Sequence, residues 1–479
     1  MTKKLGTKKR IAVFGGSFNP PHNSHREIAK ILSKQFDEVI ITPCGPRPDK
    51  RTTNEIDPIH RATMVDLAFR DIPKVRIELF DLENNSFTPT REMENIFRSE
   101  GELWHVVGTD LIAGGKTGTA LIQRSWSKGR DVWSRLKFMV TIRADAALDP
   151  DDLPPHAQTI DARSEIRSSD IRKRIFTGKP FEDLVPPAVA EYIRRHNLYR
   201  GIHHIGPTDL HRPRPRALII ANKSSAEAVA IKQRLASLEA KRDPNLIIVI
   251  GGDGTMLHAI QQHWRMRVPF YGINVGHRGF LLNNCKDDIS PDNFPEAMIA
   301  WQCPLLHVET THADRTKTTH LAFNDAWVQA HPGQSAWIEV SVNDMVRIPH
   351  LEGDGILVAT AAGSTGYARA MGAPPLPVGE RLLVLAGSHV TEPAHWKSAV
   401  LPFDANVSFK IIEQPSRTKR RPLFGFVDGT PQGETAEMKI RASKIATAEI
   451  AFSPQHSFPE KLLAIQFPSH FESPETKNR

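Results

Sequence analysis

The sequence predicts an α/β protein with parallel sheets, because short apolar strands alternate with helical stretches over much of the chain. The pattern is clearest at residues 11–14, 39–43 and 246–250, where each strand ends in glycines or in a turn-rich polar segment. In sheets of this kind, ligands bind beyond the carboxyl ends of the strands. We therefore expect the polar segments after these strands to form the functional sites.

Length and composition set the scale of the molecule. The 479 residues exceed the usual size of a single domain, and we expect roughly two to four domains. A hydrophobic content of 40% and a charged content of 24% are ordinary for a globular protein. The three cysteines, Cys44, Cys285 and Cys303, have neither metal-ligand nor CxxC spacing and cannot build a disulfide framework. This usage predicts a reducing compartment, and we expect a cytoplasmic protein.

Charge and hydropathy argue against membranes and nucleic acids as partners. No apolar run approaches the length of a membrane span, and the basic N-terminus is followed by only four apolar residues, too few for a signal peptide. The formal net charge is +8, but the basic residues are scattered apart from short clusters at 212–216 and 417–421. These clusters lack the interleaved aromatic residues of single-strand binding. Small polyanions such as ATP account for the excess as well.

The segment 11–25, IAVFGGSFNPPHNSH, predicts a phosphate site. A buried strand ends at two glycines, and the two prolines that follow suit the first turn of a helix. His22 and His25 are three residues apart and share one helix face, near the N–H groups and positive dipole end of the helix start. Such a site suits nucleotidyl transfer, where catalysis is mostly positioning and charge neutralisation. The alternative is a strand–turn–helix with two incidental histidines.

Two later segments supply further polar groups. The strand at 103–110 ends in Asp110, whose carboxylate can accept hydrogen bonds from ribose hydroxyls. In the segment 166–175, Ser168 and Ser169 are suitable N-cap residues, and Arg172 would project from the first turn of the helix. An arginine there can hold a leaving pyrophosphate.

These motifs resemble those of the nicotinate/nicotinamide-mononucleotide adenylyltransferases. GGSFNPPHNSH at 15–25 is similar to the family signature GGxFNPxHxGH, with Ser24 in place of a glycine, and IRSSDIR at 166–172 is similar to ISSTxIR, with Arg167 and Ser169 replacing Ser and Thr. The resemblance covers about residues 9 to 200. It implies a Rossmann-like nucleotidyltransferase domain over residues 1–200 in which His22, His25 and Arg172 are catalytic.

The resemblance also implies two sets of binding residues. Contacts to ATP would come from the first loop and from two later segments: Gly15, Gly16, Ser17, Phe18, Asp110, Ser168 and Ser169. Contacts to the mononucleotide would come from three cations and one aromatic ring that stacks on the pyridine: Lys50, Arg61, Arg143 and Trp126. Trp133 is expected to be packing.

A second domain begins after a linker. Residues 201–216 hold three prolines among histidines and arginines without apolar periodicity, which predicts a linker. Strand patterning then restarts, and LIIVIGGDGT at 246–255 repeats the strand–glycine–helix arrangement with Asp253 in the loop. An aspartate among phosphates would be repelled, so it either holds Mg²⁺ or accepts a proton from an attacking hydroxyl. The alternative is a simple turn aspartate.

Later segments single out one family among the kinases that share GGDGT. FYGINVGHRGFLLN at 270–283 resembles the NAD kinase segment GINxGxxGFL, and GDGILVATAAGSTGYARAMG at 353–372 resembles its GDGxxxxTPTGSTAY stretch. Asn324-Asp325 falls where that family has Asn-Glu or Asn-Asp, and Asp428-Gly429 matches a late Asp-Gly turn. The chain departs from the family pattern at these positions: Ala361, Ala362, Gly366 and Ala373.

This second resemblance covers about residues 217 to 455 and implies an NAD kinase fold over 217–479, an α/β nucleotide domain followed by a largely β domain. Asp253 would be the base that activates the 2′-hydroxyl of the adenosine ribose. ATP would bind at the glycine loop: Gly251, Gly252, Gly254 and Thr255. NAD would bind at the later motifs: Asn324, Asp325, Asp354, Thr365 and Tyr367.

The two resemblances together predict a bifunctional enzyme of NAD and NADP biosynthesis that uses ATP as substrate and Mg²⁺ or another divalent metal. The metal ligands, the choice between the nicotinamide and nicotinate mononucleotides, and the choice between ATP and polyphosphate as phosphoryl donor stay open. Family members are generally homo-oligomers. Two alternatives are enzymes acting on other substrates, such as phosphopantetheine and lipids, and one active half with a silent half that senses NAD(P).

Overall fold

The structure is a computed structural model that describes residues 8–47, 55–142, 148–162, 166–201, 206–276, 279–284, 289–412, 422–455 and 458–467. The chain divides into two compact units, Met1–His204 and Ile205–Arg479. Each unit has its own sheet and its own hydrophobic core. None of the helices in the described ranges combines the length and apolarity that a membrane span requires.

The first unit is built on a parallel sheet with the strand order β3-β2-β1-β4-β5-β6. Its strands are β1 (Arg10–Gly16), β2 (Glu38–Pro43), β3 (Val75–Ile77), β4 (Glu102–Gly108), β5 (Phe138–Ile142) and β6 (Ala157–Asp161). The order reverses between β1 and β4, and the carboxyl ends of the strands at such a switch point form a ligand crevice. The predicted Rossmann-like sheet is confirmed, and β1 and β4, the strands that lead into residues 15–18 and Asp110, flank this switch point.

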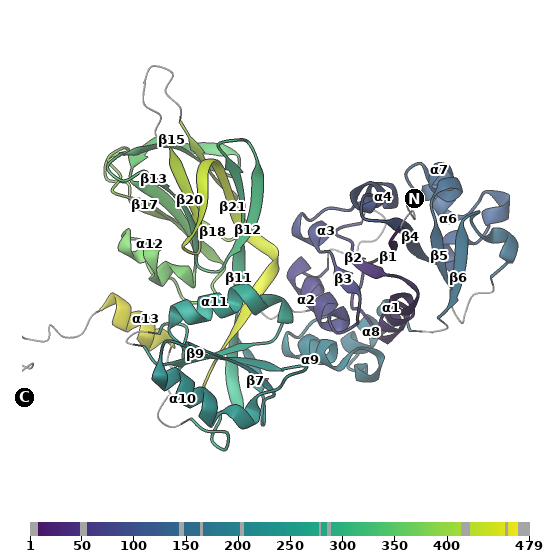
Figure 1. The fold of residues 1–479 in the computed structure, drawn as a ribbon, viewed down its shortest axis with the longest axis horizontal. Helices are drawn as coiled ribbons and strands as arrows, with labels where there is room; N and C mark the ends of the chain where they lie inside the picture. The colour runs from purple at the N-terminus through teal and green to yellow at the C-terminus, as the bar shows by residue number, and fades with distance from the viewer. Residues whose placement is uncertain are drawn as a thin grey trace, which may run out of the picture. The chain divides into compact units, whose positions relative to one another are not determined.

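Helices cover this sheet (Figure 1). They are α1 (Asn23–Gln35), α2 (Pro58–Phe69), α3 (Phe80–Glu83), α4 (Thr90–Phe97), α5 (Thr109–Ile112), α6 (Leu121–Ser125), α7 (Gly129–Arg135), α8 (Ser168–Phe176) and α9 (Pro187–Arg195). α1 buries Ala29 and Leu32, which are three residues apart and so share one face. α8 likewise buries Ile171 and Ile175, as their spacing predicted.

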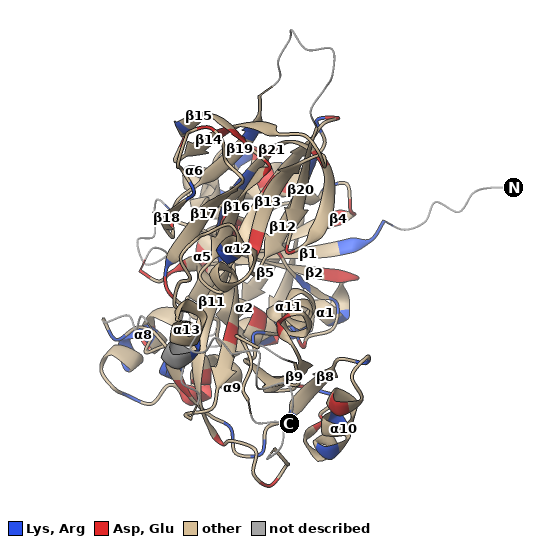
Figure 2. Ribbon diagram, turned by 90° about the vertical axis from the view of Figure 1, so that its left-hand side faces the viewer, with Lys and Arg blue, Asp and Glu red and all other residues tan. Residues whose placement is uncertain are grey.

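The second unit opens with three parallel strands, β8 (Ala217–Ala221), β9 (Leu246–Gly251) and β10 (Phe270–Asn274). α11 (Asp253–His263) and α10 (Ala226–Arg234) lie on opposite faces of this sheet (Figure 1). Alternate side chains of β9 supply the two cores, with Ile247 and Val249 toward α11 and Ile248 and Ile250 toward α10. α10 carries both acidic and basic residues (Figure 2).

The rest of the second unit is largely β, as predicted. Its strands are β11 (Ala297–His312), β12 (Lys317–Ala322), β13 (Asp325–Ala330), β14 (Ala336–Val342), β15 (Met345–Gly353), β16 (Gly355–Thr360), β17 (Leu382–Ser388), β18 (Ser398–Pro402), β19 (Val407–Ile411), β20 (Leu423–Val427) and β21 (Thr430–Phe452). Two helices accompany them, α12 (Tyr367–Ala370) and α13 (Phe458–Gln466). β21 pairs with β19 and β20 along its first part and with β10 near its end, so it joins the β part to the α/β part.

The structure corrects the predicted linker. Residues 208–211 lie within the segment predicted as a linker, but they form β7 (Thr208–His211), which pairs antiparallel with β11. Thr208 and Leu210 are buried on one side of this strand, whereas Asp209 and His211 are exposed. A strand of four residues is too short to show periodicity among prolines and charged residues.

Candidate functional site

The first candidate site lies where β1 ends and α1 begins. His22 is the N-cap of α1, and His25 lies in its first turn. The two imidazole rings are stacked with their centroids 3.6 Å apart. The backbone N–H of His22 donates to Nδ1 of His25 over 3.2 Å, so the proton of the neutral His25 ring lies on Nε2. The predicted convergence of both histidines at a helix N-terminus is therefore present.

Phe18, predicted to contact ATP, has a side chain that is only 1% exposed. Its ring packs edge-on against His25, Phe14 and Phe69, with centroids 5.0 to 5.5 Å apart. An aromatic ring buried in this way packs against the imidazole of His25 and limits its movement. The sequence did not reveal this orientation, because the backbone of Phe18 has a positive φ of 44° that periodicity does not predict.

Four side chains from other elements hold the loop between β1 and α1. Arg172 donates to the carbonyl of Asn19 over 2.7 Å, and the Ser168 hydroxyl donates to the carbonyl of Pro20 over 2.9 Å. The Tyr199 hydroxyl donates to Oδ1 of Asn19 over 2.6 Å, and burial raises the pKa of this tyrosine. The fourth side chain is that of Arg61. The loop therefore takes its shape from residues distant in sequence.

Arg61, which the resemblance predicted as a contact to the mononucleotide, is a buried cation that binds two loops. It is 1% exposed, and its guanidinium donates to the carbonyls of Ser17 and Cys44, each over 2.6 Å. Burial lowers the pKa of this guanidinium. Arg61 thus joins the loop after β1 to the loop after β2, because both loops turn their carbonyl groups toward it.

The other predicted residues of the first unit are placed as follows. Asp110 is exposed in α5, directly after β4, as expected for a strand end. Trp126 is half-buried at the end of α6 and packs against the core, while Trp133 is part of that core. Arg167, not Ser168 or Ser169, is the N-cap of α8, because the helix begins at Ser168. Lys50 and Arg143 lie outside the described residues.

The second candidate site lies at the end of β9, with Gly252 as the N-cap of α11. Asp253 is the first helical residue, and Gly254 and Thr255 complete the first turn. The two carboxylate oxygens of Asp253 accept the backbone N–H groups of Phe280 and Leu281 over 3.0 and 2.9 Å. Asp253 is therefore held by a neighbouring loop and is more than a turn residue.

A partly buried hub of hydrogen bonds around Asp428 fixes the backbone of the predicted NAD-binding residue Asn324. The carboxylate of Asp428 accepts the backbone N–H groups of Phe323, Asn324 and Asp325 over 2.7 to 3.1 Å. It also accepts the side-chain amide of Gln261, from α11, over 3.2 Å. The sequence identified Asp428 only as part of a turn. The hub connects the helix that begins with Asp253 to the segment that presents Asn324.

Asp325 lies beside this hub with its carboxyl group buried. Burial, reinforced by the neighbouring charge of Asp428, raises the pKa of Asp325 to about 7. Burial also raises the pKa of Asp428, although its backbone hydrogen bonds act in the opposite direction. The pair therefore favours a protonated state of Asp325 below neutral pH.

The GSTGY segment packs closely on Asn324. A side chain at Gly363 would place its Cβ 2.2 Å from the carbonyl oxygen of Asn324, so only glycine fits. Thr365 follows in the same turn, and the half-exposed Tyr367 ring contacts Trp327 with centroids 5.2 Å apart. Asn324, Asp325, Thr365 and Tyr367 are thus brought together.

Asp354 is not brought to this group. Asp354 comes directly before the first residue of β16. Asn324 lies at the other end of that strand, where its carbonyl accepts a hydrogen bond from the backbone N–H of Thr360. A strand of this length separates its ends by about 20 Å. Asp354 is instead 2.9 Å from His389, with both side chains largely exposed. The sequence spacing placed Asp354 in the same motif as Thr365, but the extended strand moves it away.

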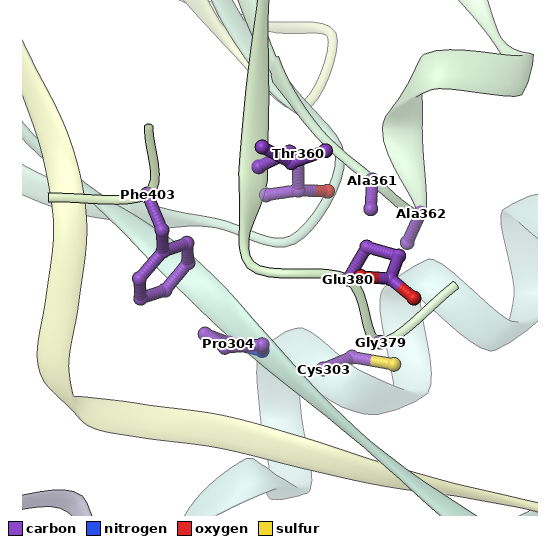
Figure 3. A pocket seen from close by; sticks show the side chains of 9 residues that line it. Cys303, Pro304, Thr360, Ala361, Ala362, Gly379, Glu380 and Phe403 are labelled. Atoms are coloured by element: carbon purple, nitrogen blue, oxygen red, sulfur yellow. The ribbon is translucent and has the colours of Figure 1, made fainter. Parts of the chain in front are cut away.

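A small pocket borders the second candidate site. Within the described ranges, no three His, Cys, Asp or Glu side chains are grouped so that they could hold a metal ion. A small pocket lies beneath the Thr360–Ala362 segment, with Cys303 and Pro304 on its opposite side (Figure 3). Its volume of about 10 Å³ suits one water molecule. Burial raises the pKa of the Cys303 thiol to about 12.

Both units thus have the sheet-edge loops of nucleotide-binding transferases, and comparison with known proteins specifies them further. Residues 13–174 match the family model described as cytidylyltransferase-like, and residues 214–298 match the ATP-NAD kinase N-terminal domain. Through its C-terminal half the chain belongs to the NAD kinase family.

Two NAD kinase sequences agree with this assignment. An NAD kinase of Cereibacter sphaeroides is 30% identical over 249 residues, which are 51% of this chain and 96% of the relative. An NAD kinase of Xanthomonas campestris pv. campestris is 31% identical over 258 residues, which are 53% of this chain and 98% of the relative. A solved NAD kinase from Archaeoglobus fulgidus in complex with ATP covers 52% of this chain and 98% of its own, with 21% identity and a TM-score of 0.39.

Proposed function

We propose that this chain catalyses two consecutive steps. The first unit joins ATP to nicotinamide or nicotinate mononucleotide and releases pyrophosphate. The second unit phosphorylates the adenosine 2′-hydroxyl of NAD and forms NADP. The single observation that carries the proposal is that both units hold their candidate catalytic residues at strand-end loops, with His22 and His25 stacked at one helix start and Asp253 fixed at another.

In the first step, a phosphate oxygen of the mononucleotide attacks the α-phosphorus of ATP, and the bond to pyrophosphate breaks. Nε2–H of His25 donates to the phosphate oxygens at the positive end of α1, where negative charge builds up in the transition state. One guanidinium nitrogen of Arg172 holds the carbonyl of Asn19. Its remaining N–H groups can hold the departing pyrophosphate, because guanidinium has five donors.

In the second step, the 2′-hydroxyl oxygen attacks the γ-phosphorus of ATP, the bond to ADP breaks, and the hydroxyl proton passes to Asp253. Each carboxylate oxygen of Asp253 accepts one backbone N–H, and a carboxylate has about four lone-pair sites, so acceptor capacity remains. Asn324 and Tyr367 would contact the dinucleotide. We propose that Mg²⁺ reaches both sites with the phosphates of ATP, where it neutralises charge. No protein ligand is assigned to it.

A one-pot assay tests the proposal. The full chain is mixed with ATP, Mg²⁺ and one mononucleotide at a time, and the products are separated by chromatography. NADP formed from nicotinamide mononucleotide supports both steps. If only the nicotinate dinucleotide forms while added NAD is still phosphorylated, the two steps share no intermediate. If NAD accumulates unphosphorylated with ATP and with polyphosphate, the kinase step is refuted.

Two variants assign the steps to the units. Asp253→Asn should lower NAD phosphorylation by about 10²- to 10⁴-fold, the scale of a lost general base, and leave adenylyl transfer unchanged. His25→Ala should lower adenylyl transfer and leave NAD phosphorylation unchanged. Retained NADP formation in Asp253→Asn would contradict the role of this residue and favour a second unit that senses NAD(P).

A further inference from the structure

The loop that holds Asp253 lies between two opposite charges. On one side, the backbone N–H groups of Phe280 and Leu281 donate to the Asp253 carboxylate. On the other side, the ammonium group of Lys461 donates to the carbonyls of Gly279 and Leu282 over 2.6 and 2.5 Å. An anion at the N–H groups and a cation at the carbonyl groups polarise the hydrogen-bonded loop in the same sense, which strengthens both sets of contacts.

Packing fixes the helix that carries Lys461. Leu462 and Ile465 of α13 pack against the core cluster that contains Phe280 and Leu282. At the end of α13, the carbonyl of Ile465 accepts a hydrogen bond from the Arg369 guanidinium over 2.6 Å. A cation is favourable at the negative end of a helix. Arg369 belongs to α12, beside which α13 lies (Figure 1), so α13 contacts both the loop that holds Asp253 and α12, the helix that begins at the last residue of GSTGY.

The path of the loop is narrowly determined. Gly279 has a φ of +134°, and a Cβ at this position would lie 2.5 Å from the Asn274 side chain. Asn283 adds two side-chain hydrogen bonds, to the carbonyls of Gly272 and Ala451. A loop so confined holds its N–H groups at fixed positions, and the carboxylate that accepts them is fixed in turn.

We propose that Lys461 is a positioning residue for NAD phosphorylation. It holds the loop 279–282 so that two N–H groups of this loop orient the Asp253 carboxylate toward the 2′-hydroxyl. The inference rests on the proposed kinase function of the second unit. It adds the C-terminal helix, which no motif in the sequence pointed to, to the parts of the chain that the reaction requires.

The test uses full-length variants. Lys461→Met removes the charge and keeps most of the length, Lys461→Arg keeps the charge, and Leu462→Ala disturbs only the packing of α13. Lys410→Met is the matched control, because Lys410 is exposed on β19. Two experiments are done on each variant. Steady-state kinetics gives kcat and KM for NAD, and hydrogen exchange is measured for the backbone amides of residues 279–282. Adenylyl transfer by the same chain reports whether the first unit is intact.

Lys461→Met should lower kcat by about 10- to 100-fold, the scale at which a reacting group displaced by roughly 1 Å is felt. KM for NAD should not rise to match, since the lost interaction acts on the transition state. Amide exchange at Phe280 and Leu281 should speed up. Lys461→Arg should recover most of the rate, whereas Lys410→Met should resemble the unaltered chain.

Three outcomes would overturn the inference. They are unchanged amide exchange in Lys461→Met, equal loss of kcat in the Met and Arg variants, and a loss in Leu462→Ala as large as that in Lys461→Met. If the unaltered chain does not phosphorylate NAD with any donor, the proposed function fails. The exchange measurement then still decides whether Lys461 orders the loop.

Discussion

At the scale of single residues, Asp325 has the clearest energetic consequence. Its carboxyl group is buried beside Asp428, and its pKa rises from an ordinary 3.8 to about 7. At a pH between these two pKa values, Asp325 is protonated in the folded chain and ionised in the unfolded chain. The free energy of unfolding of the second unit therefore falls as the pH rises from about 4 to about 7.

Asp325→Asn should remove this pH dependence, because the amide resembles the protonated carboxyl. The variant should stabilise the second unit at pH 8 by on the order of 2–4 kcal/mol and have little effect at pH 4. Denaturant unfolding at several pH values measures the difference. A gain that is the same at every pH would show that the effect is packing and not proton binding.

For a physical reason, the sequence indicated the local setting of some candidate site residues and not the contacts that others make. His22, His25, Arg172 and Asp253 lie in short contiguous motifs whose chemistry is visible in the residue types. Phe18 and Arg61 act through burial, and Asp428 and Lys461 act on backbone groups far away in the chain. Such contacts depend on the completed fold, which spacing alone does not encode.

At the scale of elements, the loop between β1 and α1 depends on the segment after α9. The Tyr199 hydroxyl reaches Asn19 over 2.6 Å in a buried position. Tyr199→Phe leaves Oδ1 of Asn19 without this donor, which should cost about 1–3 kcal/mol of stability and lower adenylyl transfer. NAD phosphorylation should not change. Steady-state kinetics of both reactions, with thermal unfolding, measure this.

Tyr192→Phe is the matched control for that variant. The Tyr192 hydroxyl is 2.9 Å from Nδ1 of His60, and Tyr192 lies in the helix just before Tyr199. Its loss should cost stability while sparing adenylyl transfer. Equal effects of the two variants on adenylyl transfer would mean that Tyr199 supports the unit as a whole and not the loop.

The turn that contains GSTGY should tolerate a methyl group at one glycine and not at another. Gly363→Ala would place Cβ 2.2 Å from the carbonyl oxygen of Asn324, and we expect a loss of NAD phosphorylation of about 100-fold. Gly366→Ala meets only the carbonyl of Gly363, at 3.3 Å, and should be nearly neutral. Kinetics of both variants check this. Equal activity would show that the turn can move away from Asn324.

Long, strongly patterned elements were predictable from the sequence, and short ones were not. The strand at 39–43 and the helix after Pro21 correspond to β2 and α1. The strand β7 and the start of α8 at Ser168 were missed. A strand of four residues is specified by its partner β11, and a helix start depends on which residue caps it.

At the scale of the whole molecule, the two units have separate cores. Leu32 is fully buried in the first unit, and Leu305 is 1% exposed in the second. Leu32→Ala and Leu305→Ala should each cost about 2–5 kcal/mol, and each should lower the unfolding temperature of one unit only. Calorimetry with both variants measures this. A single transition that both variants lower equally would contradict separate unfolding.

Local pattern and family resemblance predicted a Rossmann-like parallel sheet for the first unit, and its strand order, β3-β2-β1-β4-β5-β6, is regular. The second unit is less regular, because β21 pairs with strands from both of its parts. Pairings between distant segments leave no local trace in the sequence. The class of the second unit was therefore predictable, whereas its strand connections were not.

The shared strand β21 also limits how the second unit can move. β21 crosses from the β part into the α/β part as one strand of 23 residues, but its pairing with β11 is interrupted between Ala442 and Thr447, where the register shifts. Domain closure of the kind that many kinases use would have to bend the chain at this irregularity, because closure elsewhere would break paired hydrogen bonds. We therefore expect any movement between the two parts to occur at residues 442–447, while the paired segments of β21 on either side stay rigid.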